Sequence, residues 1–268
     1  MQKTKIKKII NKKNKIPITC LTAYSKTIAQ IADKYCDIIL VGDSLGMVLH
    51  GMKTTREVKI ENMILHGKTV KTFAKKSVVV VDMPYRTYTS KSIAYKNAKK
   101  VLKLTKCDAV KLEGGKKVTK IIKYLVDKGI SVMGHVGLLP QSSINFKLKG
   151  KNFSQKKKIL QDAIAVSNAG AFAIVIECVV ESLAKKITKS VPVPTIGIGA
   201  SKYCDGQILV TDDMLGLSDF SPKFVKKYSN LRKIIDKCVK SYVKEVKTRR
   251  FPSLKNVYKE NLNERKFI

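Results

Sequence analysis

Residues 77–82 of the chain read SVVVVD, a run of four β-branched apolar residues that ends in an acid. A strand without alternating polar residues is buried on both faces, as in a parallel sheet that is covered by helices. Similar short apolar runs recur along the chain, and we predict a strand at each of them. The other predicted strands are PITCLT from residue 17, DIILVG from 37, DAVKLEG from 108, SVMGHVG from 131, AFAIVIE from 171, PTIGIG from 194 and QILVTD from 207.

Longer segments with helical periodicity separate these strands. We expect helices at residues 95–104, 118–126, 157–168 and 222–246. Strands that alternate with helices over a chain of 268 residues favour a closed (β/α)8 barrel, the TIM-barrel fold of the α/β class. An open doubly wound sheet usually carries a glycine-rich nucleotide turn near its start, and the sequence contains neither GxGxxG nor a Walker A motif.

Two segments fall outside this alternation. Ile6, Ile9 and Ile10 are at helical spacing, which predicts a short N-terminal helix within residues 1–15 that caps one end of the barrel. Residues 140–153, PQSSINFKLKGKNF, are polar and contain glycine, so we expect a mobile loop there.

The chain is predicted to form one domain over residues 1–268, with a basic tail at 253–268, because no linker rich in Pro, Gly or Ser divides it. No apolar run is long enough to span a bilayer, and the basic N-terminus lacks the apolar segment of a secretory signal. The six cysteines form no CxxC pair, and most lie beside apolar segments, as small buried thiols do. We therefore expect a cytoplasmic protein with no membrane partner.

The chain carries 54 lysine and arginine residues against 20 acidic residues, a formal net charge of +34. Such an excess is typical of proteins that bind nucleic acid or another polyanion. However, six of the basic residues are arginine, whose bidentate fork best recognises bases and phosphates, and the rest are lysine. The lysines are spread along the chain without interleaved aromatic residues, so we expect a solvated basic surface rather than specific nucleic-acid binding.

The informative acids are those that end strands. Four of them close the apolar runs ILVGD, VVVVD, VKLE and AIVIE: Asp43, Asp82, Glu113 and Glu177. The carboxyl ends of parallel strands meet at one rim of a barrel, where such enzymes place their chemistry. Four carboxylates in one partly dry space repel each other and need a cation or protons to coexist. Oxygen ligands without a His or Cys cluster favour a hard cation, Mg2+ first.

Each of these residues also has a structural explanation. Asp43 could cap the helix that follows it, and Asp82 could end its strand in a turn. Lys111 precedes Glu113 by two residues, so both side chains face the same side of the strand. Lys111 could stabilise a substrate anion or form a salt bridge inside the barrel. His135 ends another strand and could donate to a substrate oxygen or be a structural group.

Several sequence blocks follow one another in an order that is specific to one family. They are TCLTAY (19–24), VGDSLGMV (41–48), VVDMPY (80–85), VKLEGG (110–115), VMGHVGLLPQS (132–142), FAIVIECV (172–179), PTIGIGA (194–200) and CDGQILVTDDMLGL (204–217). Together they resemble the ketopantoate hydroxymethyltransferase family, the 3-methyl-2-oxobutanoate hydroxymethyltransferases of pantothenate biosynthesis. The resemblance covers nearly the whole chain, from residue 16 to residue 252.

The resemblance implies a barrel of the phosphoenolpyruvate/pyruvate superfamily type, normally assembled as a homodecamer. It implies transfer of a hydroxymethyl group from 5,10-methylenetetrahydrofolate, the cosubstrate, to 3-methyl-2-oxobutanoate, which gives 2-dehydropantoate. It also implies one Mg2+ ion per subunit, bound directly by Asp43 and Asp82 and directly or through water by Glu113.

The resemblance further implies roles around the substrate. The residues implied to contact the 2-oxo acid are Asp43, Ser44, Asp82 and Lys111. Glu177 matches the proton acceptor of the family, and His135 matches a position that borders the substrate. The chain departs from the family in a shorter loop after Gln141, which lacks a Gly-Gly-Tyr segment, and in Ser25, where an aspartate is usual.

Two other functions stay open from the sequence. A C–C lyase or mutase on the same barrel would act on isocitrate-like or phosphonate substrates, but such enzymes carry a catalytic loop with cysteine, which we do not find in the sequence. A basic nucleic-acid-binding protein is the alternative outside the enzymes.

Overall fold

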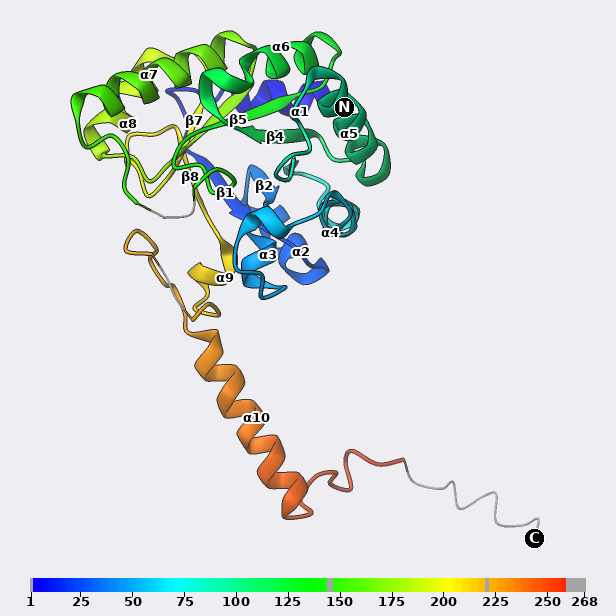
Figure 1. Ribbon diagram of the computed structural model, residues 1–268. Coiled ribbons are helices and arrows are strands. Elements are labelled where there is room, and N and C mark those ends of the chain that lie inside the picture. Colours follow the sequence, from blue (N-terminus) through cyan, green and yellow to red (C-terminus); the bar gives the residue numbers. More distant parts are fainter. Residues whose placement is uncertain (1, 144–146, 220–221, 259–268) are drawn as a thin grey trace.

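The computed structural model describes residues 2–143, 147–219 and 222–258. Its strands are all parallel and close into a barrel in chain order, with β8 pairing back to β1 (Figure 1). They are β1 (Ile18–Thr22), β2 (Ile38–Val41), β3 (Val78–Asp82), β4 (Ala109–Glu113), β5 (Val132–Gly137), β6 (Ala173–Glu177), β7 (Thr195–Ile198) and β8 (Gly206–Leu209). The predicted barrel and each predicted strand are confirmed.

Most of the helices lie around this barrel, and the last one projects away from it (Figure 1). They are α1 (Gln2–Ile10), α2 (Lys26–Tyr35), α3 (Leu45–Val48), α4 (Ile60–Phe73), α5 (Lys91–Thr105), α6 (Thr119–Asp127), α7 (Phe153–Asn168), α8 (Glu181–Ser190), α9 (Thr211–Met214) and α10 (Leu231–Lys247), with 3-10 turns η1 (Thr55–Glu57) and η2 (Gly115–Val118). The predicted helices at 95–104, 118–126 and 157–168 overlap α5, α6 and α7. Among the described residues, no helix combines the length and the apolar composition that crossing a membrane requires.

The helix predicted from residue 222 starts later than the periodicity suggested. It begins at Leu231, because the Asn230 side chain accepts a hydrogen bond from the backbone N–H of Lys233 and caps it there. The preceding segment is held in a non-helical path, in which the Tyr228 N–H donates to the carbonyl of Met214 in α9. Residues 144–146 of the predicted loop and 259–268 of the predicted tail lie outside the described residues.

Strand side chains alternate between two apolar layers. In β2, Ile38 and Leu40 belong to the cluster inside the barrel, whereas Ile39 and Val41 pack in the layer between the sheet and the helices. Because both layers are apolar, the strand has no polar alternation. This is the physical reason that continuous apolar runs identified the strands.

Helix α1 closes the N-terminal end of the barrel, as predicted. Ile6 and Ile9 are 6% and 3% exposed and belong to the same interior cluster as Ile18 and Ile38. Ile10, on another face of the helix, is exposed. Two apolar side chains of α1 therefore complete the interior core from below.

Three aspartates that directly precede strands brace the same end of the barrel. Each accepts a hydrogen bond from a backbone N–H of the adjacent strand, in the pairs Asp37 with Thr19, Asp108 with Val79 and Asp205 with Thr195. Each also forms an ion pair, with Nζ–Oδ distances of 2.5 Å for Lys12–Asp37, 2.5 Å for Lys71–Asp108 and 2.8 Å for Lys13–Asp205. We call Asp37, Asp108 and Asp205 the lower aspartates.

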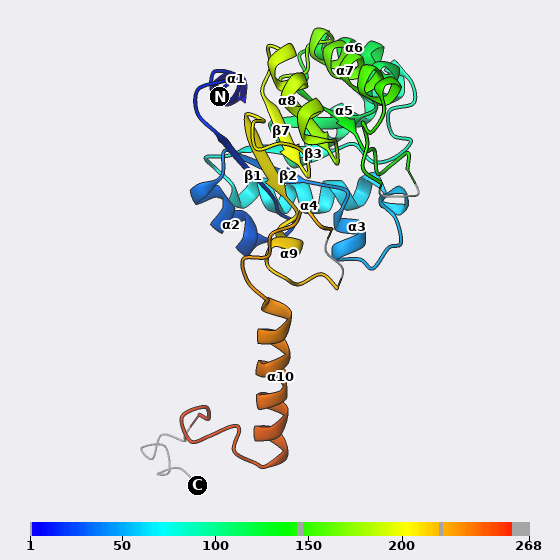
Figure 2. The ribbon, with the colours of Figure 1, turned by 90° about the vertical axis from the view of Figure 1, so that its left-hand side faces the viewer.

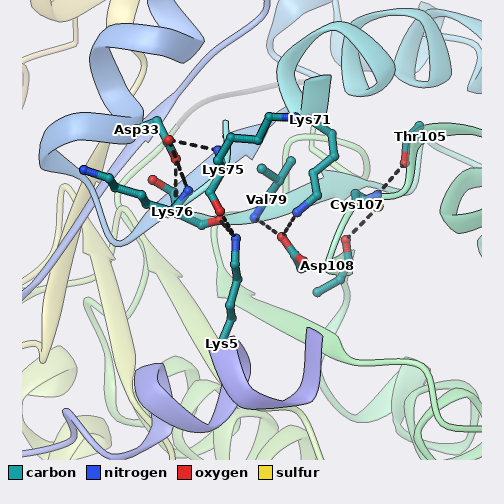
Figure 3. A network of polar contacts seen from close by, with 11 residues as sticks. Lys5, Asp33, Lys71, Lys75, Lys76, Val79, Thr105, Cys107 and Asp108 are labelled. Carbon is teal, nitrogen blue, oxygen red and sulfur yellow. Dashed lines mark hydrogen bonds and ion pairs between the residues drawn. The ribbon is translucent and has the colours of Figure 1, made fainter. Parts of the chain in front are cut away.

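Figure 3 shows how one part of this end is tied together. The Nζ of Lys5, in α1, donates to the carbonyls of Lys75 and Ser77, just before β3 begins. The carboxylate of Asp33, in α2, accepts hydrogen bonds from the backbone N–H groups of Lys75, Lys76 and Ser77. Helices α1 and α2 are thereby joined to the start of one strand.

Helix α10 projects away from the barrel (Figures 1 and 2), and none of its residues is buried. Ile235, Val239, Tyr242 and Val246 recur at spacings of four and three residues, so they lie on one face of the helix. These side chains are 43–56% exposed. The chain thus presents an apolar helix face that its own barrel does not cover.

The buried lower aspartate Asp205 should contribute strongly to stability. Burial alone would raise its pKa, but hydrogen bonds from Lys13, Thr195 and Asn14 outweigh this effect and hold the pKa below its usual range. Asp205→Ala leaves these donors unpaired, so we expect the free energy of unfolding in urea to fall by about 2–4 kcal/mol at pH 7. Because the folded pKa is lowered, this contribution is present above about pH 4 and is lost as the pH falls through the folded value.

Asp127 provides the matched control, since it pairs with Lys123 in an exposed ion pair, with the two side chains 52% and 63% exposed. Asp127→Ala should change the stability little, because exposed pairs are screened by water. Equal losses in the two variants would show that Asp205 does not brace the barrel.

Candidate active site

The acids predicted to end strands lie at the C-terminal rim of the barrel. Asp82, Glu113 and Glu177 are the last residues of β3, β4 and β6, and Asp43 follows β2. As whole residues, Asp43, Asp82 and Glu113 are 7%, 2% and 5% exposed. We call the space that these carboxylates share the carboxylate chamber. Contacts through Lys111, Gln141 and His135 link them to one another.

Lys111 is buried in the chamber and neutralises one acid directly. In the barrel register Asp82 is the partner of Lys111, and the Lys111 Nζ lies 2.6 Å from Asp82 Oδ1. The other oxygen, Asp82 Oδ2, accepts a hydrogen bond of 3.1 Å from the backbone N–H of Asp43. Burial alone would lower the pKa of Lys111, but Asp82, Asp43 and Glu113 outweigh it and raise the pKa, so Lys111 stays charged.

The other acids of the chamber carry uncompensated charge. Burial and the neighbouring Asp82 carboxylate raise the pKa of Asp43 to about 7, against the opposing effects of Lys111 and Gln141. Burial and repulsion from Asp43 raise the pKa of Glu113 well above its usual value. Both carboxyl groups therefore favour binding a proton or a cation near neutral pH.

Gln141 joins two of these acids, and it was not among the site residues predicted from the sequence. Its Nε2 donates to Asp43 Oδ2 at 2.7 Å and to the carbonyl of Met83 at 3.0 Å, and its backbone N–H donates to Glu113 Oε1 at 2.7 Å. The hydroxyl of Tyr88 donates to Gln141 Oε1 at 2.5 Å, which fixes the amide orientation.

Gln141 departs from what was expected of its segment. It belongs to the stretch 140–153, for which the sequence predicts a mobile polar loop. Gln141 is instead 2% exposed, and its side-chain amide and backbone N–H are all hydrogen-bonded. The one signal in the sequence was its place shortly after the end of β5, at the same rim as the acids.

His135 lies between two carboxylates. In the barrel register it is the partner of Glu113, and its Nδ1 lies 3.6 Å from Glu113 Oε2. Its Nε2 lies 3.3 Å from Glu177 Oε2. The ring is 3% exposed, and neither nitrogen forms a hydrogen bond of regular geometry. The imidazole therefore lies between two carboxylates without a hydrogen bond to either.

The backbone around Glu177 is tightly fixed. Its carbonyl accepts a hydrogen bond of 2.8 Å from the N–H of Leu138, and Gly137 passes so close that a Cβ there would lie 2.4 Å from the same carbonyl oxygen. The next residue, Cys178, has a left-handed φ of 47°. The Glu177 side chain is 15% exposed, more than those of Glu113 and Asp82 at 3% each, so it is the more accessible carboxylate.

Ser44 lies at the edge of the chamber and faces a buried tyrosine. Its Oγ is 2.8 Å from the hydroxyl of Tyr24, which follows β1. Burial raises the pKa of Tyr24 far above the range in which it could ionise, so the hydroxyl keeps its proton. A Cβ on Gly42 would lie 3.0 Å from Ser44 Oγ and 3.5 Å from Asp82 Oδ2, so glycine at this position leaves the space beside both oxygens open.

The donor set of the carboxylate chamber fits a magnesium ion. Among the described residues, no three Asp, Glu, His or Cys side chains form a complete metal cage. Mg2+ does not require one, since it usually takes one or two protein carboxylates and fills its other positions with water and substrate oxygens. Asp43 and Asp82 are joined by a hydrogen bond and suit this pair, while Glu113, held by Gln141, suits a contact through water.

The raised pKa of Asp43 predicts how the stability of the metal-free protein depends on pH. The folded value of about 7 exceeds the unfolded value of about 4, so the stabilisation of protonated Asp43 is present at low pH and is lost as the pH rises from about 4 through 7. We expect the Tm in EDTA to fall between pH 5 and pH 8, by about 2–4 °C for each kcal/mol of stability lost.

Asp43→Asn is the control, because the amide stays neutral over this range and should flatten the profile. Mg2+ at pH 8 should raise the Tm of the wild-type chain and leave the Tm of the variant unchanged. If the Tm fell equally with pH in both proteins, ionisation of Asp43 would not be the cause of the loss of stability.

Comparison with known proteins agrees with this geometry. A sequence profile described as ketopantoate hydroxymethyltransferase matches residues 3–254. The chain is similar to 3-methyl-2-oxobutanoate hydroxymethyltransferase of Pelagibacter ubique, at 54% identity over 95% of this chain and 99% of that protein. It is also similar to proteins of the same name from Phenylobacterium zucineum, at 50% identity over 93% of this chain and 92% of the relative, and from Anaplasma marginale, at 50% over 96% and 94%.

Solved structures that resemble the chain share its fold at low identity. They include 2,3-dimethylmalate lyase, a member of the PEP mutase/isocitrate lyase superfamily, with a TM-score of 0.63, 11% identity and coverage of 95% of this chain and 90% of that one. Phosphonopyruvate hydrolase with oxalate and Mg2+ has a TM-score of 0.61, 11% identity and coverage of 94% and 93%. These matches confirm the predicted (β/α)8 barrel fold. From its sequence and over nearly its whole length, the chain belongs to the ketopantoate hydroxymethyltransferase family.

Proposed function

We propose that the chain is a 3-methyl-2-oxobutanoate hydroxymethyltransferase, which transfers a hydroxymethyl group from 5,10-methylenetetrahydrofolate to 3-methyl-2-oxobutanoate and gives 2-dehydropantoate for pantothenate biosynthesis. Its family membership and the names of its relatives support this over a lyase or mutase reaction on the same barrel. The observation that carries the proposal is the buried carboxylate chamber, in which Lys111 pairs with Asp82 while His135 lies between Glu113 and Glu177.

Asp43 and Asp82 would hold Mg2+ directly, with Glu113 in contact through water. The bound ion would supply Lewis-acid stabilisation of the negative charge that develops on the 2-oxo acid. The contacts of Gln141 with Asp43 and Glu113 support these roles, because its side-chain amide holds Asp43 and its backbone N–H holds Glu113.

Glu177 is our candidate for the base that removes the proton from the branched carbon of the substrate. Asp82 is held by Lys111, and Asp43 and Glu113 are held by Gln141. Among the described contacts, Glu177 has no donor as strong as these, since its nearest one is His135 Nε2 at 3.3 Å from Oε2. Its side chain is also more exposed than those of Asp82 and Glu113. A carboxylate that is fixed through its backbone but accessible at its tip suits proton transfer.

Lys111, Ser44 and His135 are our candidates for substrate contacts. The charge on Lys111 would attract the carboxylate of the 2-oxo acid and the developing enolate, which is an electrostatic role in a low-dielectric space. Ser44 Oγ, beside Tyr24, and His135, beside Glu177, lie where hydrogen bonds could orient the acid against the base.

The decisive assay measures 2-dehydropantoate formation from 3-methyl-2-oxobutanoate and methylenetetrahydrofolate. We expect product with Mg2+ and none with EDTA, and restoration when Mg2+ is added back. Glu177→Gln keeps the size and polarity of the side chain but cannot accept the proton, so turnover should fall by about 10²–10⁴-fold.

Calorimetry of Mg2+ binding provides the control for Glu177→Gln, since the variant should bind the ion nearly as the wild type does. Near-normal turnover would remove Glu177 from the role of base. Absence of product with the wild-type chain under all metal conditions would overturn the proposed reaction itself.

We also propose that the enzyme assembles as a homo-oligomer, a homodecamer by the resemblance of its sequence to the family. The uncovered apolar face of α10 supports self-association, because an isolated helix of this length is marginal in water without packing. A second copy of the chain is a partner that can cover this face in every subunit.

Light scattering tests the assembly, with an expected mass of ten times the 29.9 kDa of one chain. Val239→Asp puts a charge on the apolar face of α10 and should reduce the mass severalfold. Lys237→Asp, on the opposite face of the same helix, is the matched control and should leave the mass unchanged. A monomeric wild-type chain would contradict the proposal.

We further propose a cytoplasmic location and a single domain over residues 1–268. The six cysteines support the location, because no disulfide joins them among the described residues, as is usual where thiols are kept reduced. The closed barrel and the seating of α1 in its core support the single domain.

A further inference from the structure

His50 and His66 form a pair at the barrel surface that the proposed reaction does not use. His50 follows α3, and His66 lies in α4. Their Nε2 atoms are 3.2 Å apart, with ring centroids separated by 5.3 Å and ring planes at 66°. Together with His135 in the chamber, these are the three histidines of the whole sequence. Two of the three therefore meet at one point, although they are 16 residues apart.

The hydrogen bonds of the pair determine which nitrogen carries each proton. The Nδ1 of His66 is 2.8 Å from the carbonyl oxygen of Tyr24. A carbonyl oxygen can only accept, so His66 Nδ1 carries the hydrogen and its Nε2 has a free lone pair. His50 Nε2 must then be the donor in the contact between the rings. The lone pair of His66 Nε2 thus points at the Nε2 of the exposed His50 ring.

This arrangement matches half of a metal site. Imidazole nitrogens bind Zn2+ at about 2.0–2.1 Å, and a tetrahedral angle at the ion then sets the two nitrogens about 3.3–3.4 Å apart. The observed 3.2 Å needs almost no adjustment. A carbonyl that accepts from the other ring nitrogen, as Tyr24 does for His66, is also the usual outer partner of a metal-bound histidine, because it fixes the tautomer and the ring.

We propose that His50 and His66 bind a divalent transition-metal ion of the Zn2+, Cu2+ or Ni2+ class through their Nε2 atoms, with water in the remaining positions. No third His, Cys, Asp or Glu gathers with them in the described part of the chain, which leaves those positions open. Binding requires a change of tautomer at His50, whose proton moves from Nε2 to Nδ1, while His66 is already in the correct form.

The proposed site is chemically distinct from the carboxylate chamber. Imidazole selects Zn2+, Cu2+ and Ni2+, whereas Mg2+ takes oxygen ligands, so Mg2+ would not occupy the histidine pair. The two sites are nevertheless neighbours, because Tyr24 bonds to His66 through its carbonyl and to Ser44 through its hydroxyl. The inference rests on the histidine geometry and does not depend on the proposed reaction.

Calorimetry with Zn2+ on the full chain, in excess Mg2+ to occupy the carboxylates, tests the proposal. We expect one zinc ion per chain in the wild type and an affinity at least about tenfold weaker in His50→Gln, which removes one ligand from an exposed position. Cys238→Ser is the matched control, since Cys238 is an exposed thiol that could itself bind zinc, and this variant should keep the wild-type affinity.

Electron paramagnetic resonance of the protein with one equivalent of Cu2+ gives a second measurement. We expect coupling to two imidazole nitrogens in the wild type and its loss in His50→Gln. Equal zinc affinity in His50→Gln and the wild type, or no zinc binding in excess Mg2+, would overturn the proposal. Neither result would bear on the transferase assay, which uses Mg2+ alone.

Discussion

The excess of negative charge at the C-terminal mouth of the barrel is the constraint on which the rest of the site depends. Four strand-end carboxylates share the rim with Lys111 and His135 as the basic groups in contact with them. Burial makes each charge costly, and the raised pKa values of Asp43 and Glu113 are the consequence. Such a chamber is stable only with protons or a cation, which is the property that a divalent ion and an anionic 2-oxo acid can exploit together.

The two ends of the barrel use acids in opposite ways. The lower aspartates precede strands, and lysines together with backbone N–H groups satisfy them, so they brace the fold. The acids at the C-terminal ends of the strands have fewer cationic partners, so they can bind a proton or a metal ion. The difference follows from the direction of parallel strands, which separates residues before a strand from residues after it by the height of the barrel.

Much of the fold could be predicted because burial on both faces leaves a direct mark in the sequence, a continuous apolar run. The start of α10 could not, because the periodicity of residues 222–230 is helical, whereas the Tyr228 N–H donates to the carbonyl of Met214 in α9 and the helix begins only at Leu231. Gln141 was missed for a related reason. A single glutamine in a polar stretch carries no pattern, and its importance arises from contacts with Asp43 and Glu113 that are distant in the chain.

The amino-acid sequence alone determined the barrel, the cap formed by α1, the family and the identity of the strand-end acids. Each of these follows from the spacing of residues that are close in the chain or from the order of the sequence motifs. The tertiary structure decided which acid meets which partner: Asp82 with Lys111, Glu113 with Gln141, and Glu177 with His135. It also brought His50 to His66 and left α10 uncovered. These are contacts between residues far apart in order, and their distances exist only once the strands have closed into a ring.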